Sequence, residues 1–168
     1  GDWSSDVCSS DLTGLLNDRG LLTELARQMS LPSRVHQGLI GIHITNFDTI
    51  HDLCGPIQAH ALEQRIAAVL SKHPHGLHAA RLSSGRFALV LECQTVAHLR
   101  SIARELYSAL NAQTFKANHG ALRLQASIGG LQIDSGIVST SEDVLLSLSD
   151  AMAIAASVRV PQLFVEPL

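Results

Sequence analysis

The residue types that could do chemistry in this chain are histidine, cysteine and serine, together with an arginine that follows a tight turn. Three of its nine histidines, His43, His51 and His60, lie within 18 consecutive residues of the sequence. Imidazole is a common ligand of transition metals, so a metal site is one interpretation of this group. The other is that they are ordinary side chains, because the remaining histidines are spread along the whole sequence.

Nucleophilic chemistry has less support in the sequence. The cysteines Cys8, Cys54 and Cys93 are odd in number and have no CxxC spacing, which is typical of free thiols in a reducing compartment. No neighbouring motif would activate Cys54 or Cys93, so we expect small buried or inert side chains. A Ser/His/Asp triad has no GxSxG elbow to support it.

The most distinctive local feature is a short turn between two apolar runs. Residues 79–83 and 87–92 flank Ser84-Gly85, a pattern that predicts a β-hairpin. Arg86 follows the turn directly. It is either an anion-binding residue or a loop arginine that faces solvent, and the sequence leaves both alternatives open.

The elements around this hairpin follow from hydrophobic periodicity. Asn17 can cap a first helix, and the almost continuous apolar run Leu39 to Ile44 predicts a strand buried on both faces. The later elements are a helix after Gly55-Pro56 with apolar positions Ala61, Leu62, Ile66, Val69 and Leu70, a helix from about Thr95, a strand over 122–131, a helix over 139–158 and a last strand over 162–165. This order predicts an α+β fold with a ferredoxin-like βαββαβ core, in which helices flank a mostly antiparallel central sheet.

Length and composition set the class of protein. The 168 residues are 46% hydrophobic and 16% charged, which predicts one folded domain. The net charge of −3 and the scattered lysines and arginines argue against a nucleic-acid partner. The apolar runs are too short to cross a membrane, at ~20 residues per span. We expect residues 1–12 to be a non-native or disordered leader, and residues 13–168 to form the domain.

Five segments in order resemble the GGDEF family of cyclic nucleotide signalling domains. The run Leu12 to Arg19 is similar to the family's DxLTGLxNR motif, and Ile42 to Phe47 is similar to its IDIDHF strand. The signature RYGGDEFA corresponds to Arg81-Leu82-Ser83-Ser84-Gly85-Arg86-Phe87-Ala88. Ala126 to Gly129 resembles the late SIG strand, and Ser149 to Met152 resembles the ADxAM motif with which the family's last helix starts. The resemblance therefore implies the GGDEF fold over nearly the whole chain.

The resemblance also implies what the family's chemistry requires. Diguanylate cyclases of this family join two GTP molecules, one held by each of two monomers, with the help of Mg²⁺. Magnesium requires hard oxygen ligands, which carboxylates of the first core strand and of the hairpin would supply. Here His43 and Thr45 stand at the strand's acidic positions, and Gly85 and Arg86 stand at those of the hairpin. We therefore expect no metal cofactor and no catalytic residue.

Other positions of the implied nucleotide pocket differ as well. Ser83 and Ser84 replace the glycines over which the nucleotide would lie, and Asp48 stands where a phosphate-contacting lysine is expected. The remaining replacements are His51 and His60 at the guanine-binding positions and Ser157 at a lysine position of the last helix. The family's inhibitory product site, RxxD, corresponds to residues 74–77, which lack both charged residues, so product feedback is not expected.

The sequence therefore predicts a catalytically inactive GGDEF-like domain in cyclic di-GMP signalling that regulates or dimerises. Its last residues, Phe164 to Leu168, resemble the junction into an EAL phosphodiesterase domain, so the expected partners are an adjoining EAL domain and a second copy of this chain. One alternative is an allosteric sensor that binds GTP, with low affinity, without turnover. Another is an active nucleotidyl cyclase with altered metal ligands. We expect a cytoplasmic location, with no membrane contact by this segment.

Overall fold

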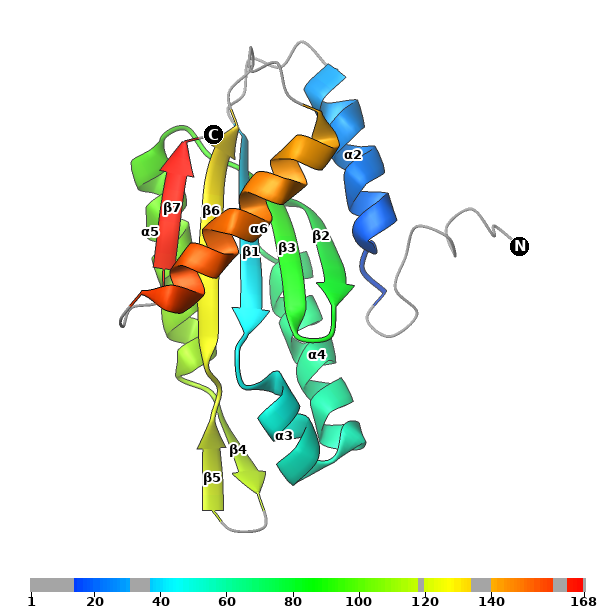
Figure 1. Ribbon diagram of the computed structural model, residues 1–168, viewed down its shortest axis with the longest axis vertical. Helices are drawn as coiled ribbons and strands as arrows, with labels where there is room; N and C mark the ends of the chain where they lie inside the picture. The colour runs from blue at the N-terminus through cyan, green and yellow to red at the C-terminus, as the bar shows by residue number, and fades with distance from the viewer. Residues whose placement is uncertain (1–13, 31–36, 118–119, 134–139, 159–162, 168) are drawn as a thin grey trace, which may run out of the picture.

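The centre of the protein is a five-stranded sheet with the strand order β2-β3-β1-β6-β7 (Figure 1). The computed structural model describes residues 14–30, 37–117, 120–133, 140–158 and 163–167. Its elements are α2 (Asp18–Ser30), β1 (Gln37–Ile44), α3 (Phe47–Cys54), α4 (Pro56–Ser71), β2 (Gly76–Ser83), β3 (Arg86–Glu92), α5 (Val96–Asn111), β4 (Thr114–Ala117), β5 (Gly120–Arg123), β6 (Ala126–Ile133), α6 (Ser141–Ser157) and β7 (Leu163–Pro167).

Strand pairing confirms the predicted fold class. β1 lies between β3 and β6 and runs antiparallel to both, and β2 pairs antiparallel with β3. β7 is added beside β6 and is parallel to it. The order of β2, β3, β1 and β6, with helices in the two crossovers, is the ferredoxin-like βαββαβ arrangement. The predicted buried strand at 39–44 is the core of β1, where His43 is the only residue that is not fully buried.

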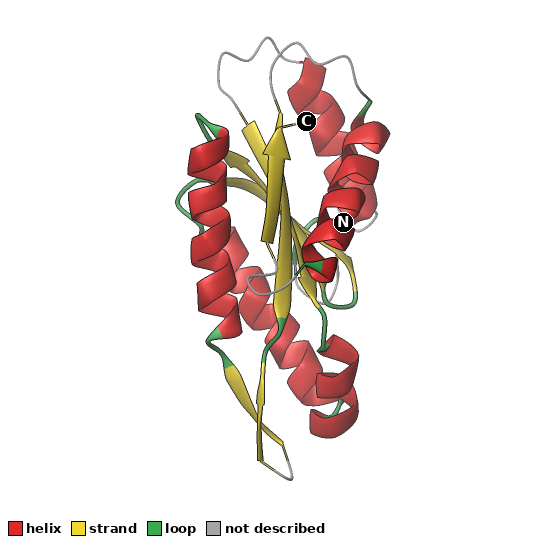
Figure 2. Ribbon diagram, turned by 60° about the vertical axis from the view of Figure 1, so that its left-hand side comes forward, coloured by secondary structure: helices red, strands yellow, loops and turns green. Residues whose placement is uncertain are grey.

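Helices cover both faces of the sheet (Figure 2). Ile40, Ile42 and Phe87 point to the layer of α4 and α5, whereas Leu39 and Ala88 point to the layer of α2 and α6. Alternation along β1 and β3 produces this division, because successive side chains of a strand point to opposite faces. Each residue near the hairpin can therefore be assigned to one of two layers.

Capping residues fix where three of the helices begin. The Asn17 side chain accepts a hydrogen bond from the Gly20 amide at 2.9 Å, as predicted for the first helix. Thr95 caps α5, and Thr140 and Asp143 form a capping box at the start of α6. Among the described helices, none is long and apolar enough to cross a membrane.

Two parts of the prediction are wrong. The sequence predicts one strand over 122–131, but β5 ends at Arg123 and β6 begins at Ala126. β4 and β5 form a separate two-stranded ribbon beyond the end of the main sheet (Figure 1). Helix α3 is also absent from the prediction. Its preceding residue, Asn46, is of a type that often caps a helix, but its side chain makes no capping hydrogen bond in the structure.

The remaining predicted elements agree with the structure to within a few residues. The helix predicted over 139–158 is α6, and the strand predicted over 162–165 is β7. Cys93 is buried and Cys54 is half-buried, as expected for small apolar side chains. The segment 1–12 that we expect to be a leader, and Cys8 within it, lie outside the described residues.

Candidate functional site

The predicted hairpin is present and is fixed to the central strand. β2 and β3 are joined by the two-residue turn Ser84-Gly85, with Ser83 opposite Arg86. The turn residue Gly85 has a φ of 71°, a left-handed conformation that glycine adopts without strain. Its carbonyl oxygen accepts a hydrogen bond of 2.8 Å from the Ile44 amide at the end of β1. The end of β1 and the turn thus form one rigid unit.

The turn has little room for a side chain at its glycine. A Cβ atom placed on Gly85 would lie 2.8 Å from Cβ of Phe47, the first residue of α3. The two serines before it, Ser83 and Ser84, are exposed. A carboxylate at the position of Gly85 would therefore require Phe47 or the turn itself to shift.

Three polar side chains form a row across the sheet beside this turn. His43 on β1 lies opposite Arg86 on β3 and opposite Ser127 on β6, so that all three point to the α2 and α6 layer. Arg86 is exposed, His43 is half-buried, and Ser127 has no exposed surface. The hydroxyl of Ser127 has no hydrogen-bond partner among the described residues.

The charges around this row act on His43. Its pKa is lowered from the usual 6.5, first by burial and then by the positive charge of Arg86, while Asp48 on α3 raises it. In the described part of the chain, no carboxylate forms an ion pair with Arg86. At pH 7 the row therefore contains the cation of Arg86, which has no ion-pair partner among the described residues, and the neutral imidazole of His43.

The opposite side of the hairpin carries a residue pair that the sequence did not predict. Glu63 on α4 is 4% exposed, and its Oε2 atom accepts a hydrogen bond of 2.8 Å from Nε of Arg81 on β2. The same oxygen accepts a hydrogen bond of 3.2 Å from the Gly85 amide. A second bond joins Arg81 Nη2 to Glu63 Oε1 at 3.3 Å. Glu63 is thus the carboxylate that touches the turn, and Arg81 already neutralises it.

The helical period of the sequence does contain a signal that Glu63 is buried. The buried residues of α4 are Ala59, Leu62, Glu63, Ile66, Ala67 and Leu70. The predicted apolar stripe instead included Ala61 and Val69, which are half-buried and exposed. A stripe that starts at Ala59 places Glu63 one turn later on the buried face, where a charge requires a partner.

The other predicted pocket residues lie farther along the neighbouring helices. His51 and Asp48 are exposed on α3, and His60 is half-buried on α4. Ser157 ends α6, and its hydroxyl donates a hydrogen bond to the Ile154 carbonyl. Within the described residues, no group of three His, Cys, Asp or Glu side chains could hold a metal ion, so His43, His51 and His60 do not assemble one.

The donors at the hairpin do not fit Mg²⁺. His43, Gly85, Arg86 and Ser127 offer an imidazole, a side-chain-free turn, a cation and a hydroxyl. Magnesium prefers carboxylate and phosphate oxygens in octahedral geometry, and a guanidinium repels it. Glu63 touches the turn from the α4 side, but both of its oxygens are engaged by Arg81.

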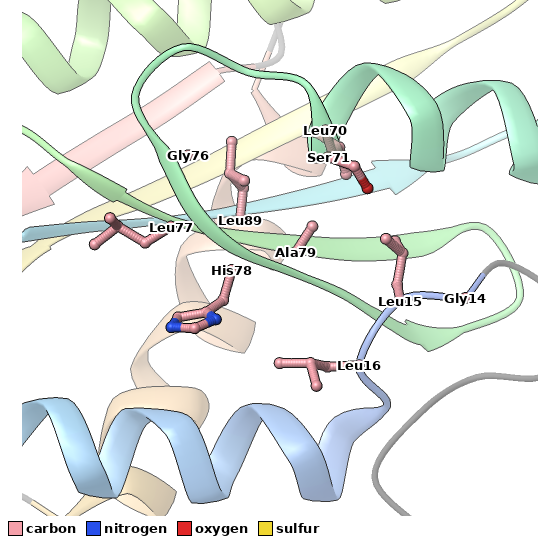
Figure 3. A pocket seen from close by; sticks show the side chains of 10 residues that line it. All are labelled: Gly14, Leu15, Leu16, Leu70, Ser71, Gly76, Leu77, His78, Ala79 and Leu89. Atoms are coloured by element: carbon pink, nitrogen blue, oxygen red, sulfur yellow. The ribbon is translucent and has the colours of Figure 1, made fainter. Parts of the chain in front are cut away.

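The segment that corresponds to the family's RxxD lines a hollow of about 270 Å³ between the end of α4 and β2 (Figure 3). Leu15, Leu16, Leu70 and Leu77 contribute to its wall. His78 also lines it, and its Nε2 atom lies 3.2 Å from Glu24 Oε2 on α2. Leu77 stands at the aspartate position of the family's motif, and Pro74, at the arginine position, is not among the residues that line the hollow.

Fold and site together define a ferredoxin-like α+β domain in which a two-residue hairpin turn is hydrogen-bonded to the end of the central strand. The family model "Diguanylate cyclase, GGDEF domain" matches residues 9–156, and the chain therefore belongs to the GGDEF family. No curated protein matches the sequence.

Solved GGDEF structures have the same fold. The coiled coil and GGDEF domain of DgcB from Caulobacter crescentus, in complex with c-di-GMP, has a TM-score of 0.80 at 16% identity, covering 97% of this chain and 87% of that one. The GGDEF domain of FimX from Pseudomonas aeruginosa has a TM-score of 0.75 at 19% identity, covering 95% and 99%. Diguanylate cyclase SiaD from the same organism, in complex with its activator SiaC, has a TM-score of 0.76 at 18% identity. The match covers 98% of this chain and 63% of SiaD. At these identities the likeness shows the fold alone.

Proposed function

We propose that this GGDEF domain is catalytically inactive and acts as a regulatory or dimerisation module in cyclic di-GMP signalling. The observation that carries the proposal is the donor set at the hairpin, where His43, Gly85 and Arg86 occupy the positions of the family's acids. Phosphodiester synthesis by two Mg²⁺ ions needs carboxylates to hold the metals against the triphosphate. Without them, the Mg²⁺ that this chemistry uses has no anionic ligand from the hairpin.

The packing around the turn supports the same conclusion. Phe47 fills the space that a side chain at Gly85 would need, so an acid at this position would require Phe47 or the turn to move. Glu63 is the described carboxylate in contact with the turn, and it is buried in a pair with Arg81. Releasing it to a metal would leave a partly buried guanidinium without its partner, which is costly.

We infer that the module acts on an attached EAL phosphodiesterase domain or on a second copy of the chain. The residues from Phe164 to Leu168 resemble the junction to an EAL domain, and β7, which contains most of them, is fixed to the central sheet by its pairing with β6. A rigid connection of this kind would transmit a change in the GGDEF domain to whatever follows it. SiaD offers a precedent for a protein of similar fold that works with a protein partner.

A cyclase assay tests the proposal directly. The purified chain is incubated with GTP and either Mg²⁺ or Mn²⁺, and cyclic di-GMP is measured by chromatography, with an active GGDEF protein as positive control. No product is expected with either metal. Product formation that depends on Mn²⁺ would instead support a cyclase with altered metal ligands, and would refute the inactive assignment.

A reconstruction sharpens this assay. We expect the double variant His43→Asp/Arg86→Glu to remain inactive, because Gly85 still lacks a side chain and Phe47 still occupies its space. Recovery of activity by these two substitutions alone would show that the turn can hold a metal without an acid at Gly85.

A second candidate function is a sensor that binds GTP without converting it. The observation that favours it is the exposed Arg86, for which the described residues provide no ion-pair partner, next to His43. Binding of GTP would regulate an attached domain only if the ligand had different affinities for two states of the protein. Calorimetric titration with millimolar GTP tests the binding, and no heat together with no thermal shift would eliminate this candidate.

A further inference from the structure

A polar cluster joins helix α2 to strand β2 at the end of β2 that lies away from the signature hairpin. The ring of His78 on β2 points toward α2 (Figure 3). Its Nε2 atom lies 3.2 Å from Glu24 Oε2 and 3.3 Å from Gln28 Nε2, and these two side chains are one turn apart on the helix. The side chains of His78 and Glu24 are only 27% and 25% exposed. One partly buried ring nitrogen therefore faces two partners.

The two partners require opposite protonation states of this nitrogen. A carboxylate only accepts hydrogen bonds, so a bond to Glu24 needs a proton on His78 Nε2. The amide nitrogen of Gln28 only donates, so a bond to it needs a lone pair at the same place. Because one nitrogen cannot offer both, the two contacts exclude one another even though their distances are almost equal.

The orientation of the Gln28 amide is fixed from its other end. Its Oε1 atom accepts a hydrogen bond from Nε2 of Gln37, the first residue of β1. The NH2 group of Gln28 then points to His78, which favours the neutral tautomer with a proton on Nδ1 and a lone pair on Nε2. In this state Arg27 holds Glu24, because its Nε and Nη2 atoms donate to the same Oε2 atom at 3.1 and 3.0 Å.

We propose that His78 is a proton-operated selector that changes how α2 is attached to the sheet. In the neutral state its Nε2 atom accepts a hydrogen bond from Gln28. When the ring gains a proton, which histidine does near physiological pH, Nε2–H donates to Glu24 in a charge-assisted bond. The Gln28 amide then faces a donor and must turn. This inference goes beyond the proposed function and does not depend on it, because the signature hairpin takes no part.

The groups around His78 make Glu24 the acid that a proton on the ring would engage. On α2 the charged groups are Glu24 and, through it, Arg27, which compete with the ring for one carboxylate oxygen. On β3 the residue opposite His78 is Val90, and Gln37 on β1 is likewise uncharged. The described residues of α4 that line the same hollow are Leu70 and Ser71, which carry no charge.

Protonation should tighten the attachment of α2. In the neutral state the bond to Gln28 joins two uncharged groups, and the carboxylate of Glu24 lies against the lone pair of the ring. In the protonated state an ion pair connects α2 to β2. Because α2 also packs against α6 on this face of the sheet (Figure 2), a change at His78 reaches both helices of the layer. The layer would thereby respond to pH.

The decisive measurement is the protonation pattern of the His78 ring in the 168-residue chain. Imidazole nitrogen and carbon resonances distinguish the two neutral tautomers and the imidazolium in an NMR titration from about pH 8 to about pH 5, and His78→Gln assigns the signals. We expect the proton on Nδ1 at high pH and on both nitrogens at low pH. A neutral ring with its proton on Nε2 would overturn the proposal, because it would donate to Glu24 before protonation.

A variant tests whether Gln28 selects the tautomer. Gln28→Met keeps the length of the side chain and removes the amide, so the neutral ring should move its proton to Nε2 and donate to Glu24 at high pH. A tautomer that stays the same in this variant would refute the selector. The titration of the parent chain decides the question by itself if the variant does not fold.

Amide hydrogen exchange in α2, corrected for the intrinsic effect of pH, measures the consequence for the helix. Between about pH 8 and about pH 5.5, exchange should slow about two- to fivefold, the range for one partly exposed ion pair. Glu24→Gln should lose this slowing. Glu105→Gln removes an exposed carboxylate from α5, in the other helix layer, and should keep it. Slowing that persists in Glu24→Gln, or that disappears equally in both variants, would contradict the proposal.

Discussion

The two sides of the signature hairpin have opposite characters. On the α4 side, the buried Glu63 is paired with the half-buried Arg81 and accepts a hydrogen bond from the Gly85 amide. On the α6 side, Arg86 is exposed without a carboxylate partner among the described residues, and His43 beside it has a lowered pKa. Two arginines five residues apart in sequence therefore do different things in the fold.

This difference separates the residues of the hairpin that stabilise the fold from those that do not. Arg81 matches the family's signature, and its partner Glu63 is hydrogen-bonded to the turn from the α4 side. Arg86 stands at an acidic position of the signature and is exposed, with no ion-pair partner among the described residues. Substitutions at the hairpin should accordingly separate into those that strongly lower the free energy of unfolding and those that leave it almost unchanged.

The largest expected effect comes from breaking the buried pair. Arg81→Met should reduce the free energy of unfolding by ~3–5 kcal/mol, because it leaves the buried carboxylate of Glu63 without its partner. The same substitution at Arg86, in the same hairpin, is the matched control and should change it by less than ~1 kcal/mol. Urea denaturation of the two variants measures both values, and similar losses would contradict the assignment of the pair to the fold.

A second effect concerns the turn. Gly85→Ala should cost ~2–4 kcal/mol, as it adds the strain of a left-handed alanine, ~1–2 kcal/mol, to a contact with Phe47. Gly14→Ala is the matched control, since Gly14 has a φ of 72° and open space around its Cβ position. The difference between the two variants in thermal or urea unfolding isolates the Phe47 contact. Equal losses would show that the turn moves freely away from α3.

Much of this architecture could be predicted from the sequence, because its strongest signals are local. The hairpin, β1 and the helices α5 and α6 follow from alternation, periodicity and the capping residues Thr95 and Thr140. Helix α3 could not, as it spans eight residues without a side-chain cap. The break between β5 and β6 is set by tertiary contacts: the amides of Thr45 and Leu124 bond to the Gln125 and Gln113 carbonyls.

The sequence predicts which acidic residues of the site are replaced, but it does not predict the contacts that the structure adds there. The replacement of acids by His43, Gly85 and Arg86 is visible in the sequence once the family pattern is aligned. The Glu63–Arg81 pair joins residues 18 positions apart on a helix and a strand, so it depends on how α4 packs under β2. The Phe47 contact and the buried Ser127 hydroxyl likewise exist only in three dimensions.

A smaller effect is expected at the buried hydroxyl. Ser127→Ala should leave the free energy of unfolding unchanged or raise it by up to ~1 kcal/mol, because it removes a buried group that has no partner among the described residues. Ser83→Ala, at an exposed position of the hairpin, should change it by less than ~0.5 kcal/mol. A clear loss of stability in Ser127→Ala, measured by urea denaturation, would mean that the hydroxyl is bonded in solution, for example to a buried water.

The smallest effect, and the sharpest test of the α6 side, is the titration of His43. Its pKa in the folded protein lies below the unfolded value of about 6.5, so the unfolded chain binds the proton first as the pH falls. Stability should therefore decrease between pH 6.5 and the lowered pKa, and His43→Gln should flatten this decrease. His73, whose pKa is also lowered by burial, contributes in the same direction, and His73→Gln serves as the comparison.

Substitution of the neighbours shows which cause of the shift acts at His43. Arg86→Gln should raise the pKa of His43 toward 6.5, and Asp48→Asn should lower it further, as the two charges act in opposite directions. Both shifts can be followed through the imidazole resonances in NMR titrations. If neither variant moves the pKa, burial alone sets it. Arg86 would then be too far from the ring to affect its protonation.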